Sequence, residues 1–153
     1  MYHFVTNWFF NAPIERVWKE IEDPKAWSIW LRDFKKITPR PLESMQQVGN
    51  TVDVEYRGNL PYTFHFALEV TKVKPPTLIE LKATGDLIGT GKWLLESHNQ
   101  GTAVTYYWDV GVTNPIFNLL ISLPFVKSIT ESNHNATMDK AFHALKSKLE
   151  VID

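Results

Sequence analysis

The residue whose chemistry and position best suit a functional site is His134. It precedes Met138 by four residues in a segment with the apolar spacing of a helix, which places the two side chains about 40° apart on one apolar stripe. An imidazole titrates near neutral pH, so His134 can anchor a polar group of a ligand or act as a general acid or base. A helix histidine that bonds a backbone carbonyl or a water molecule is the other interpretation, and the sequence leaves both open.

Charged neighbours of His134 offer the second part of an acid/base site. Glu131 lies three residues before His134, and Lys127 lies four residues before Glu131, so all three are neighbours on one helix surface. A Glu131–His134 pair would orient the imidazole and raise its basicity. The same charges also fit the solvated end of the helix, where the apolar stripe leaves the core. Asn133 lies about 140° from Met138 and is expected to point away from the stripe.

Tyrosine and tryptophan recur at every second position of the central segments. Tyr56, Tyr62, Trp93, Tyr106 and Trp108 share the parity of the apolar residues, which predicts that they face one side of a sheet. Each carries a donor that needs a partner when buried. This favours a lined pocket, although an aromatic core with hydroxyls that reach the sheet edge also fits. The residues expected to line the pocket are Tyr56, Tyr62, Phe64, Phe66, Leu81, Gly91, Trp93, Tyr106, Trp108, His134 and Met138.

Composition and spacing argue against several classes of site. The chain has no cysteine, which excludes disulfides, thiolate metal sites and cysteine nucleophiles. The five histidines do not have the spacing of metal ligands. The carboxylates on predicted strands have outward parity, and Gly89-x-Gly91 lacks the third glycine of a dinucleotide site. We therefore expect no metal and no cofactor. A net charge of −1 argues against nucleic-acid binding.

The elements that position these residues follow from apolar periodicity. A strand is predicted over residues 2–10, and Pro13 and Pro24 each begin a short helix, because proline is tolerated in a first helical turn. From about residue 34 to 112, apolar and polar residues alternate between Gly, Pro and Asn turns, which predicts antiparallel strands. A long amphipathic helix follows from about Val126 to Val151. Its apolar stripe consists of Met138, Ala141, Phe142, Leu145, Leu149 and Ile152.

Together these elements predict one α+β domain over residues 1–153. A sheet with one apolar face must be covered, and among the predicted helices only the C-terminal one is long enough. We expect a curved antiparallel sheet of about six or seven strands wrapped around the long C-terminal helix, with two short helices after the first strand. Such an arrangement often leaves an interior volume between the sheet and the helix.

An apolar segment, residues 116–126, precedes the long helix. It has about half of the ~20 residues that a membrane span requires, and Asn118, Ser122 and Pro124 interrupt it. We expect residues 114–124 to form a mobile lid or entrance, and a weak contact between residues 116–126 and a membrane surface is a further interpretation. The N-terminal residues lack the basic-then-apolar pattern of a secretory signal, so a cytoplasmic location is expected.

The chain also carries a series of short motifs whose order is informative. They are Ala12-Pro13, Val17-Trp18, Asp23-Pro24, Trp27, Trp30, Leu60-Pro61-Tyr62, Gly85-Asp86-Leu87, Gly89-Thr90-Gly91-Lys92-Trp93, Gly101-Thr102, Trp108-x-Val110, Asn118-Leu119-Leu120, Asn133-His134 and Met138. In this order they resemble the SRPBCC superfamily, the START-like helix-grip group, and in particular a bacterial branch of polyketide cyclase/dehydrase type. The resemblance covers nearly the whole chain. It implies a helix-grip fold with an internal cavity for an apolar small molecule, and it implies no particular reaction. Thr130 and Ser132 stand where that branch has bulky aromatics, which implies a wider or more polar far end of the cavity.

Three functions are compatible with these observations. The first is the binding of a small hydrophobic molecule, such as a lipid, quinone or polyketide, in the internal cavity. The second is a polyketide cyclase or dehydratase in which His134, together with Glu131, moves a proton and tyrosine hydroxyls stabilise an enolate. The third is a peripheral membrane protein that collects lipid through residues 116–126. The sequence indicates no oligomeric state.

Overall fold

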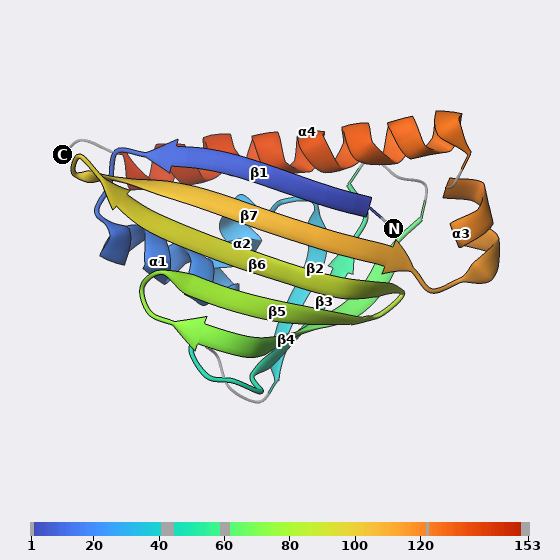
Figure 1. The fold of residues 1–153 in the computed structure, drawn as a ribbon, viewed down its shortest axis with the longest axis horizontal. Coiled ribbons are helices and arrows are strands. Elements are labelled where there is room, and N and C mark those ends of the chain that lie inside the picture. Colours follow the sequence, from blue (N-terminus) through green and yellow to red (C-terminus); the bar gives the residue numbers. More distant parts are fainter. Residues whose placement is uncertain (1, 41–44, 59–61, 122, 151–153) are drawn as a thin grey trace.

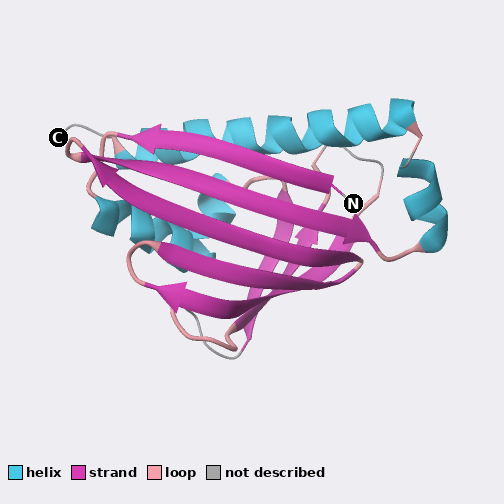
Figure 2. Ribbon diagram, in the orientation of Figure 1, coloured by secondary structure: helices cyan, strands magenta, loops and turns pink. Residues whose placement is uncertain are grey.

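The computed structural model describes residues 2–40, 45–58, 62–121 and 123–150. The helices and strands are, in chain order, β1 (Tyr2–Phe10), α1 (Ile14–Glu22), α2 (Pro24–Trp30), β2 (Phe34–Arg40), β3 (Thr51–Tyr56), β4 (Phe64–Lys74), β5 (Leu78–Gly85), β6 (Leu87–His98), β7 (Gly101–Val112), α3 (Pro115–Ile121) and α4 (Pro124–Leu149). This order confirms the predicted α+β class, with two short helices after the first strand and a long helix at the end (Figure 2).

The seven strands form one antiparallel sheet in the order β1-β7-β6-β5-β4-β3-β2. From β2 onward each strand pairs with the next one in the chain. β1 instead pairs with β7, with Tyr2 opposite Val110 and Phe10 opposite Thr102. In Figure 1 the sheet curls so that β2 and β3 lie behind the front strands, and α4 runs beside β1. The sheet therefore has a concave face, and α4 covers it.

Prolines mark the starts of helices. Pro24 lies in the first turn of α2, where the Asp23 carboxylate accepts a hydrogen bond from the Lys25 amide at 3.0 Å. α4 begins at Pro124, slightly earlier than the periodicity predicted near Val126. The difference arises because proline in the first helical turn removes no intrahelical hydrogen bond. The predicted C-terminal end of this helix, at residue 151, lies outside the described residues.

The C-terminal half of α4 packs closely into the core. From Met138 onward its buried residues are Met138, Ala141, Leu145 and Leu149, and the predicted stripe member Ile152 lies outside the described residues. Near α2, the rings of Trp8, Trp30 and Trp93 meet with centroids 5.7 to 6.2 Å apart. At this end the interior is packed with aromatic rings, and Trp8, Trp30 and Trp93 are each at most 7% exposed.

Candidate functional site

A cavity of about 100 Å³ lies between the concave face of the sheet and the N-terminal half of α4. Its wall comes from β1, β3, β4, β6, β7 and α4, together with Leu31 and Phe34 at the corner between α2 and β2. The residues of the predicted pocket that line this cavity are Tyr56, Phe64, Phe66, Trp93, Tyr106, Trp108, His134 and Met138. Strand parity had assigned the aromatic residues to one face, and the curvature of the sheet brings them together.

Three residues of the predicted pocket, Tyr62, Leu81 and Gly91, are not among the described residues that line the cavity. Tyr62 packs edge-on against Phe64, with ring centroids 4.9 Å apart. Leu81 is buried and lies opposite Gly91 across β5 and β6. Parity therefore placed Leu81 and Gly91 on the inner face, but it does not show how far along each strand the cavity extends.

The glycines of β6 make room for the protein's own groups. A Cβ at Gly91 would lie 3.1 Å from the Trp108 ring and 3.6 Å from the Tyr106 hydroxyl oxygen. Gly89 has a φ of +150°, and a Cβ there would lie 1.9 Å from the carbonyl oxygen of Asp109. Gly91 thus lets two rings lie against β6, and Gly89 lets the backbones of β6 and β7 approach each other.

β1 supplies lining residues that the sequence analysis missed. Tyr2 and Phe4 both line the cavity, and their rings are parallel with centroids 5.7 Å apart. Tyr2 and Phe4 alternate along the strand, which indicates that both side chains lie on the same face of the sheet. β1 pairs with β7, and this pairing brings Tyr2 opposite Val110 at the cavity. The sequence pattern did not predict this pairing because more than one hundred residues separate the two strands.

His134 lies against Phe4, with ring centroids 3.7 Å apart and an interplanar angle of 25°. Its Nε2 atom is buried and has no hydrogen-bond partner within the residues that the structure describes. Burial lowers the pKa of the imidazole to about 4, so the ring is neutral at pH 7. His134 therefore brings a neutral imidazole, with an unsatisfied nitrogen, to the cavity wall.

Glu131 does not pair with His134. Among the described residues no hydrogen bond or ion pair joins them, and desolvation alone accounts for the lowered pKa of His134. The negative charge of Glu131 acts on Tyr2 instead, whose pKa is raised mainly by burial and in smaller part by this charge. An acid/base pair of the expected kind would raise the pKa of the imidazole, and burial has the opposite effect.

Tyr106 lies in a row of aromatic rings on the concave face. Its ring stacks on Trp93 with centroids 4.1 Å apart, and Trp108 follows at 6.1 Å. Burial raises the pKa of the phenol above its ordinary value, and the hydroxyl makes no hydrogen bond with any part of the chain that the structure describes. Tyr106 is partly buried where it lines the cavity, so its hydroxyl is a second polar group that lacks a protein partner there.

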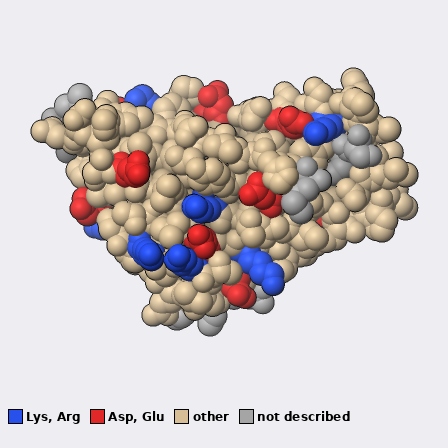
Figure 3. All heavy atoms as spheres, viewed as in Figure 1, with Lys and Arg blue, Asp and Glu red and all other residues tan. Residues whose placement is uncertain are grey.

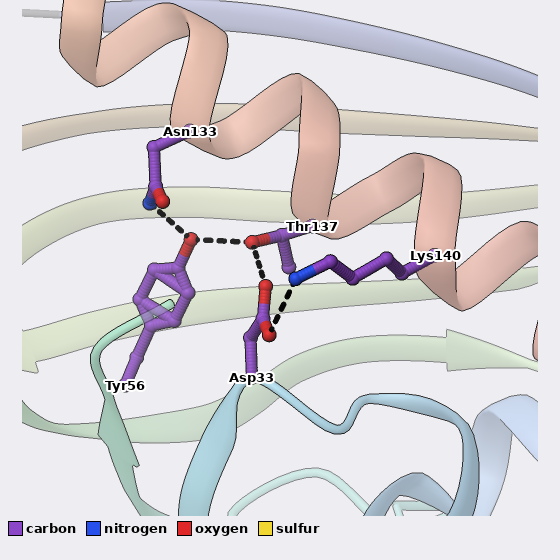
Figure 4. Close-up of polar contacts among 5 residues, drawn as sticks. All are labelled: Asp33, Tyr56, Asn133, Thr137 and Lys140. Atoms are coloured by element: carbon purple, nitrogen blue, oxygen red, sulfur yellow. Dashed lines mark hydrogen bonds and ion pairs between the residues drawn. The ribbon is translucent and has the colours of Figure 1, made fainter. Parts of the chain in front are cut away.

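A chain of hydrogen bonds connects α4 to β3 and to the turn before β2 (Figure 4). Asn133 Nδ2 donates to the Tyr56 hydroxyl at 2.8 Å, and the Tyr56 and Thr137 hydroxyls lie 2.8 Å apart. Thr137 donates to Asp33 at 2.6 Å, and Lys140 contacts the same carboxylate at 3.3 Å. Because the single hydroxyl proton of Thr137 goes to Asp33, Tyr56 must donate to Thr137. The Tyr56 proton is therefore engaged within the protein and is not offered to the cavity.

This network corrects the expectation that Asn133 points away from the core. Asn133 is only 7% exposed. Gly58 has a φ of +59°, and a Cβ there would lie 2.9 Å from Asn133 Oδ1. Helical geometry does place Asn133 off the apolar stripe, but β3 and the residues after it reach that flank of α4 and bury it. Asp33, which the sequence analysis did not single out, completes the network from the turn between α2 and β2.

Comparison with known proteins identifies the family. The family described as "Polyketide cyclase / dehydrase and lipid transport" matches residues 1–150. The chain belongs to this family. The predicted resemblance to SRPBCC proteins of the polyketide cyclase/dehydrase branch is thereby confirmed. Among curated proteins, none matches the chain in sequence.

Solved structures share the fold of this polyketide cyclase/dehydrase family member at low sequence identity. TTHA0849 from Thermus thermophilus is 15% identical with a TM-score of 0.76, and the match covers 96% of this chain and 99% of that one. CV1439 from Chromobacterium violaceum is 16% identical with a TM-score of 0.69, and the match covers 98% of each chain. Ms6760 from Mycobacterium smegmatis is 15% identical with a TM-score of 0.67, and the match covers 96% of this chain and 90% of that one. At these identities the likeness shows the fold alone.

In this family member the described cavity wall carries no aspartate, glutamate, lysine or arginine. The described residues also contain no group of three or more His, Asp or Glu side chains that could hold a metal ion. None of the helices in residues 2–40, 45–58, 62–121 and 123–150 has the length and apolar character that crossing a bilayer requires. The site is thus an uncharged, mostly aromatic cavity with two unsatisfied polar groups.

Proposed function

We propose that the protein binds a small hydrophobic molecule, of the lipid, quinone or polyketide kind, in the cavity between the sheet and α4. The observation that carries this proposal is the contrast between the two ends of the interior. The tryptophans near α2 and the C-terminal half of α4 pack closely, whereas the aromatic wall around Tyr106 and His134 leaves a cavity. Protein interiors are normally close-packed, and the lining of a void loses dispersion contacts. An apolar ligand would restore them.

The size of the cavity limits how the ligand enters. At about 100 Å³ it is smaller than the roughly 300–1,000 Å³ of pockets that enclose drug-sized ligands. A larger ligand therefore requires part of the wall to move. The Asn133–Tyr56 and Thr137–Asp33 hydrogen bonds hold the middle of α4, and α3 packs mainly on α4 and β7. The part free to move is therefore α3 with the first turns of α4, as the lid hypothesis for residues 114–124 requires.

The direct test is to look for a bound molecule. Native mass spectrometry of freshly purified protein, before and after solvent extraction, should show a mass that extraction removes. Titration of extracted protein with the neutral fluorophore N-phenyl-1-naphthylamine should then give a saturable, one-to-one enhancement. Extracted protein that gives no saturable signal with this probe would contradict the proposal.

The enzymatic alternative, a cyclase or dehydratase, relies on His134 as the base. A base whose pKa is about 4 is a weak acceptor for a proton on carbon at pH 7. The partner expected for it, Glu131, forms no pair with it in the described structure. Binding is therefore the function that the geometry supports best.

A membrane contact is favoured by one specific observation. Six large apolar side chains on α3 and the start of α4 are between 46% and 76% exposed. We call this set the α3–α4 apolar surface. It consists of Ile116, Leu119, Leu120, Leu123, Phe125 and Ile129. Figure 3 shows charged side chains mainly over the strands and few at the α3 end of the visible face. From residue 114 to 130 the chain has no acidic residue, and Lys127 is its single charge.

The position of this surface links it to the cavity. Val112 immediately precedes the α3 region, Thr130 follows the first turns of α4, and both line the cavity. Exposed apolar patches of this kind mark interaction sites, and an apolar segment without carboxylates suits the interface of a phospholipid bilayer. We infer that the α3–α4 apolar surface contacts a lipid surface from which the cavity takes up its ligand.

A further inference from the structure

The cavity wall carries information about the charge of the ligand. Its described residues include no ionised side chain, and the single imidazole, His134, is neutral at pH 7. Charged groups lie behind the wall: Glu131 acts on Tyr2, and Asp33, which is paired with Lys140, acts on Tyr56. An ionised group moved from water into such a cavity loses its hydration and gains no counter-charge. An anion near Tyr2 would also be repelled by the carboxylate of Glu131.

The hydroxyl groups of the wall indicate which polar group the ligand has. The hydroxyl of Tyr56 already donates to Thr137, so it has no proton to offer. The hydroxyl of Tyr106 has no partner in the described structure, and Gly91, which lies beside it, has no side chain to cover it. Tyr106 is partly buried at the cavity wall, so its unpartnered hydroxyl is open to the cavity and can donate to an acceptor that a ligand brings. The ligand group that matches an O–H donor in an uncharged wall is a neutral acceptor such as a carbonyl oxygen.

We propose that the cavity selects uncharged apolar molecules that carry a carbonyl-type acceptor for the Tyr106 hydroxyl, and that it rejects carboxylates of the same shape. This inference rests on the proposed binding function and narrows it. It favours ketones, quinones and esters over free fatty acids, although both classes are hydrophobic. One side of the wall suits planar conjugated molecules, because it is formed by the nearly parallel rings of Trp93, Tyr106 and Trp108. The interplanar angle is 23° between Trp93 and Tyr106 and 18° between Tyr106 and Trp108.

Three probes of nearly equal size separate charge from hydrogen bonding. They are methyl 2-naphthoate, 2-naphthoate and 2-propylnaphthalene, titrated at pH 7.4 into solvent-extracted protein and followed by tryptophan fluorescence. The ester should bind at least about tenfold more tightly than the carboxylate, because only the carboxylate must be desolvated as an ion. The ester should bind about three- to tenfold more tightly than the hydrocarbon, because only the ester accepts from Tyr106.

A matched pair of variants assigns the hydrogen bond. Tyr106→Phe removes one oxygen from the cavity and should make the ester and the hydrocarbon bind equally, with the affinity for the hydrocarbon unchanged. Tyr107→Phe removes the same oxygen from the neighbouring residue of β7, whose ring lies under Lys92 rather than in the cavity wall, and should change neither affinity. Thermal melts of both variants check that each is folded.

The outcomes separate this inference from the proposed function. Carboxylate binding as tight as ester binding in the wild type, or an unchanged ester preference in Tyr106→Phe, would overturn the inference while binding itself stands. If none of the three probes binds, both the inference and the proposed function are contradicted.

Discussion

The hydroxyl of Tyr56 on β3 and the hydroxyl of Thr137 on α4 lie 2.8 Å apart and form the central bond of a directed chain from Asn133 to Asp33. This bond divides α4 into two parts. The C-terminal part is packed into the core, and the N-terminal part, with Thr130 and His134, forms one side of the cavity. The network thus fixes the helix at the edge of the proposed binding site.

Removal of a network member should destabilise the fold. Asn133→Ala leaves the buried Tyr56 hydroxyl with one hydrogen bond fewer, and we expect a loss of about 1–3 kcal/mol in the free energy of unfolding. Asn135→Ala changes an exposed asparagine on the same helix and should cost less than about 0.5 kcal/mol. Urea denaturation of both variants measures the difference, and equal midpoints would show that the network contributes no stability.

Gly58 should be coupled to Asn133. Gly58→Ala adds a Cβ at 2.9 Å from Asn133 Oδ1 in a left-handed backbone conformation, so we expect a cost of about 1–3 kcal/mol. In an Asn133→Ala background the contact with Asn133 is gone, and the cost should fall to the backbone part plus the contact of the new Cβ with the Tyr56 hydroxyl at 3.2 Å. A double-mutant cycle by urea denaturation tests this expectation. Strictly additive costs would mean that the close approach of the two residues has no energetic consequence.

His134 should make stability depend on pH. Its pKa is about 4 in the folded protein against an ordinary value of 6.5, so between these values the unfolded chain binds more protons. The contribution of His134 to the free energy of unfolding is therefore nearly constant above pH 6.5 and falls as the pH decreases toward 4. The expected loss in the free energy of unfolding at pH 4.5 is roughly 2–3 kcal/mol relative to pH 7.5.

His134→Gln should lack this pH-dependent loss, whereas His143→Gln, at an exposed position of α4, should retain it. Parallel pH profiles for the wild type and His134→Gln would show that the imidazole is not desolvated.

The α3–α4 apolar surface should mediate binding to lipid. We expect the wild type to float with vesicles of phosphatidylcholine and phosphatidylglycerol, and the variant Leu119→Ser/Phe125→Ser to remain in the unbound fraction. The control Val5→Ser/Ile88→Ser replaces two exposed apolar residues on strands and should float like the wild type. If the wild type does not float and instead sediments as a dimer that the Leu119→Ser/Phe125→Ser variant disrupts, this surface joins two copies of the chain.

Local patterns in the sequence were sufficient to predict the fold and part of the cavity wall. Period-two alternation assigned Trp93, Tyr106 and Trp108 to one face, and Pro13 and Pro24 marked helix starts because a first turn tolerates proline. Pro124 was interpreted as an interruption of the apolar segment, although α4 begins there. His134 was assigned to the inner side of α4 by its spacing from Met138, and both line the cavity.

The remainder depends on contacts between distant segments. The burial of Asn133 arises because β3 and the residues after it reach one flank of α4, and Asp33 joins the network from a turn more than one hundred residues away. Tyr2 lines the cavity because β1 pairs with β7. The periodicity of a single segment describes which face a residue occupies, but it does not describe what the other segments place opposite that face.

The most direct test of ligand binding is to fill the cavity from α4. Thr130 lines the cavity, whereas Ser132 is exposed on the outside of the same helix. Thr130→Trp should abolish the saturable binding of N-phenyl-1-naphthylamine, while Ser132→Trp should bind the probe like the wild type. Thr130→Val, which removes the hydroxyl without filling space, should also bind. Undiminished binding to a folded Thr130→Trp protein would contradict the claim that the ligand lies between the sheet and α4.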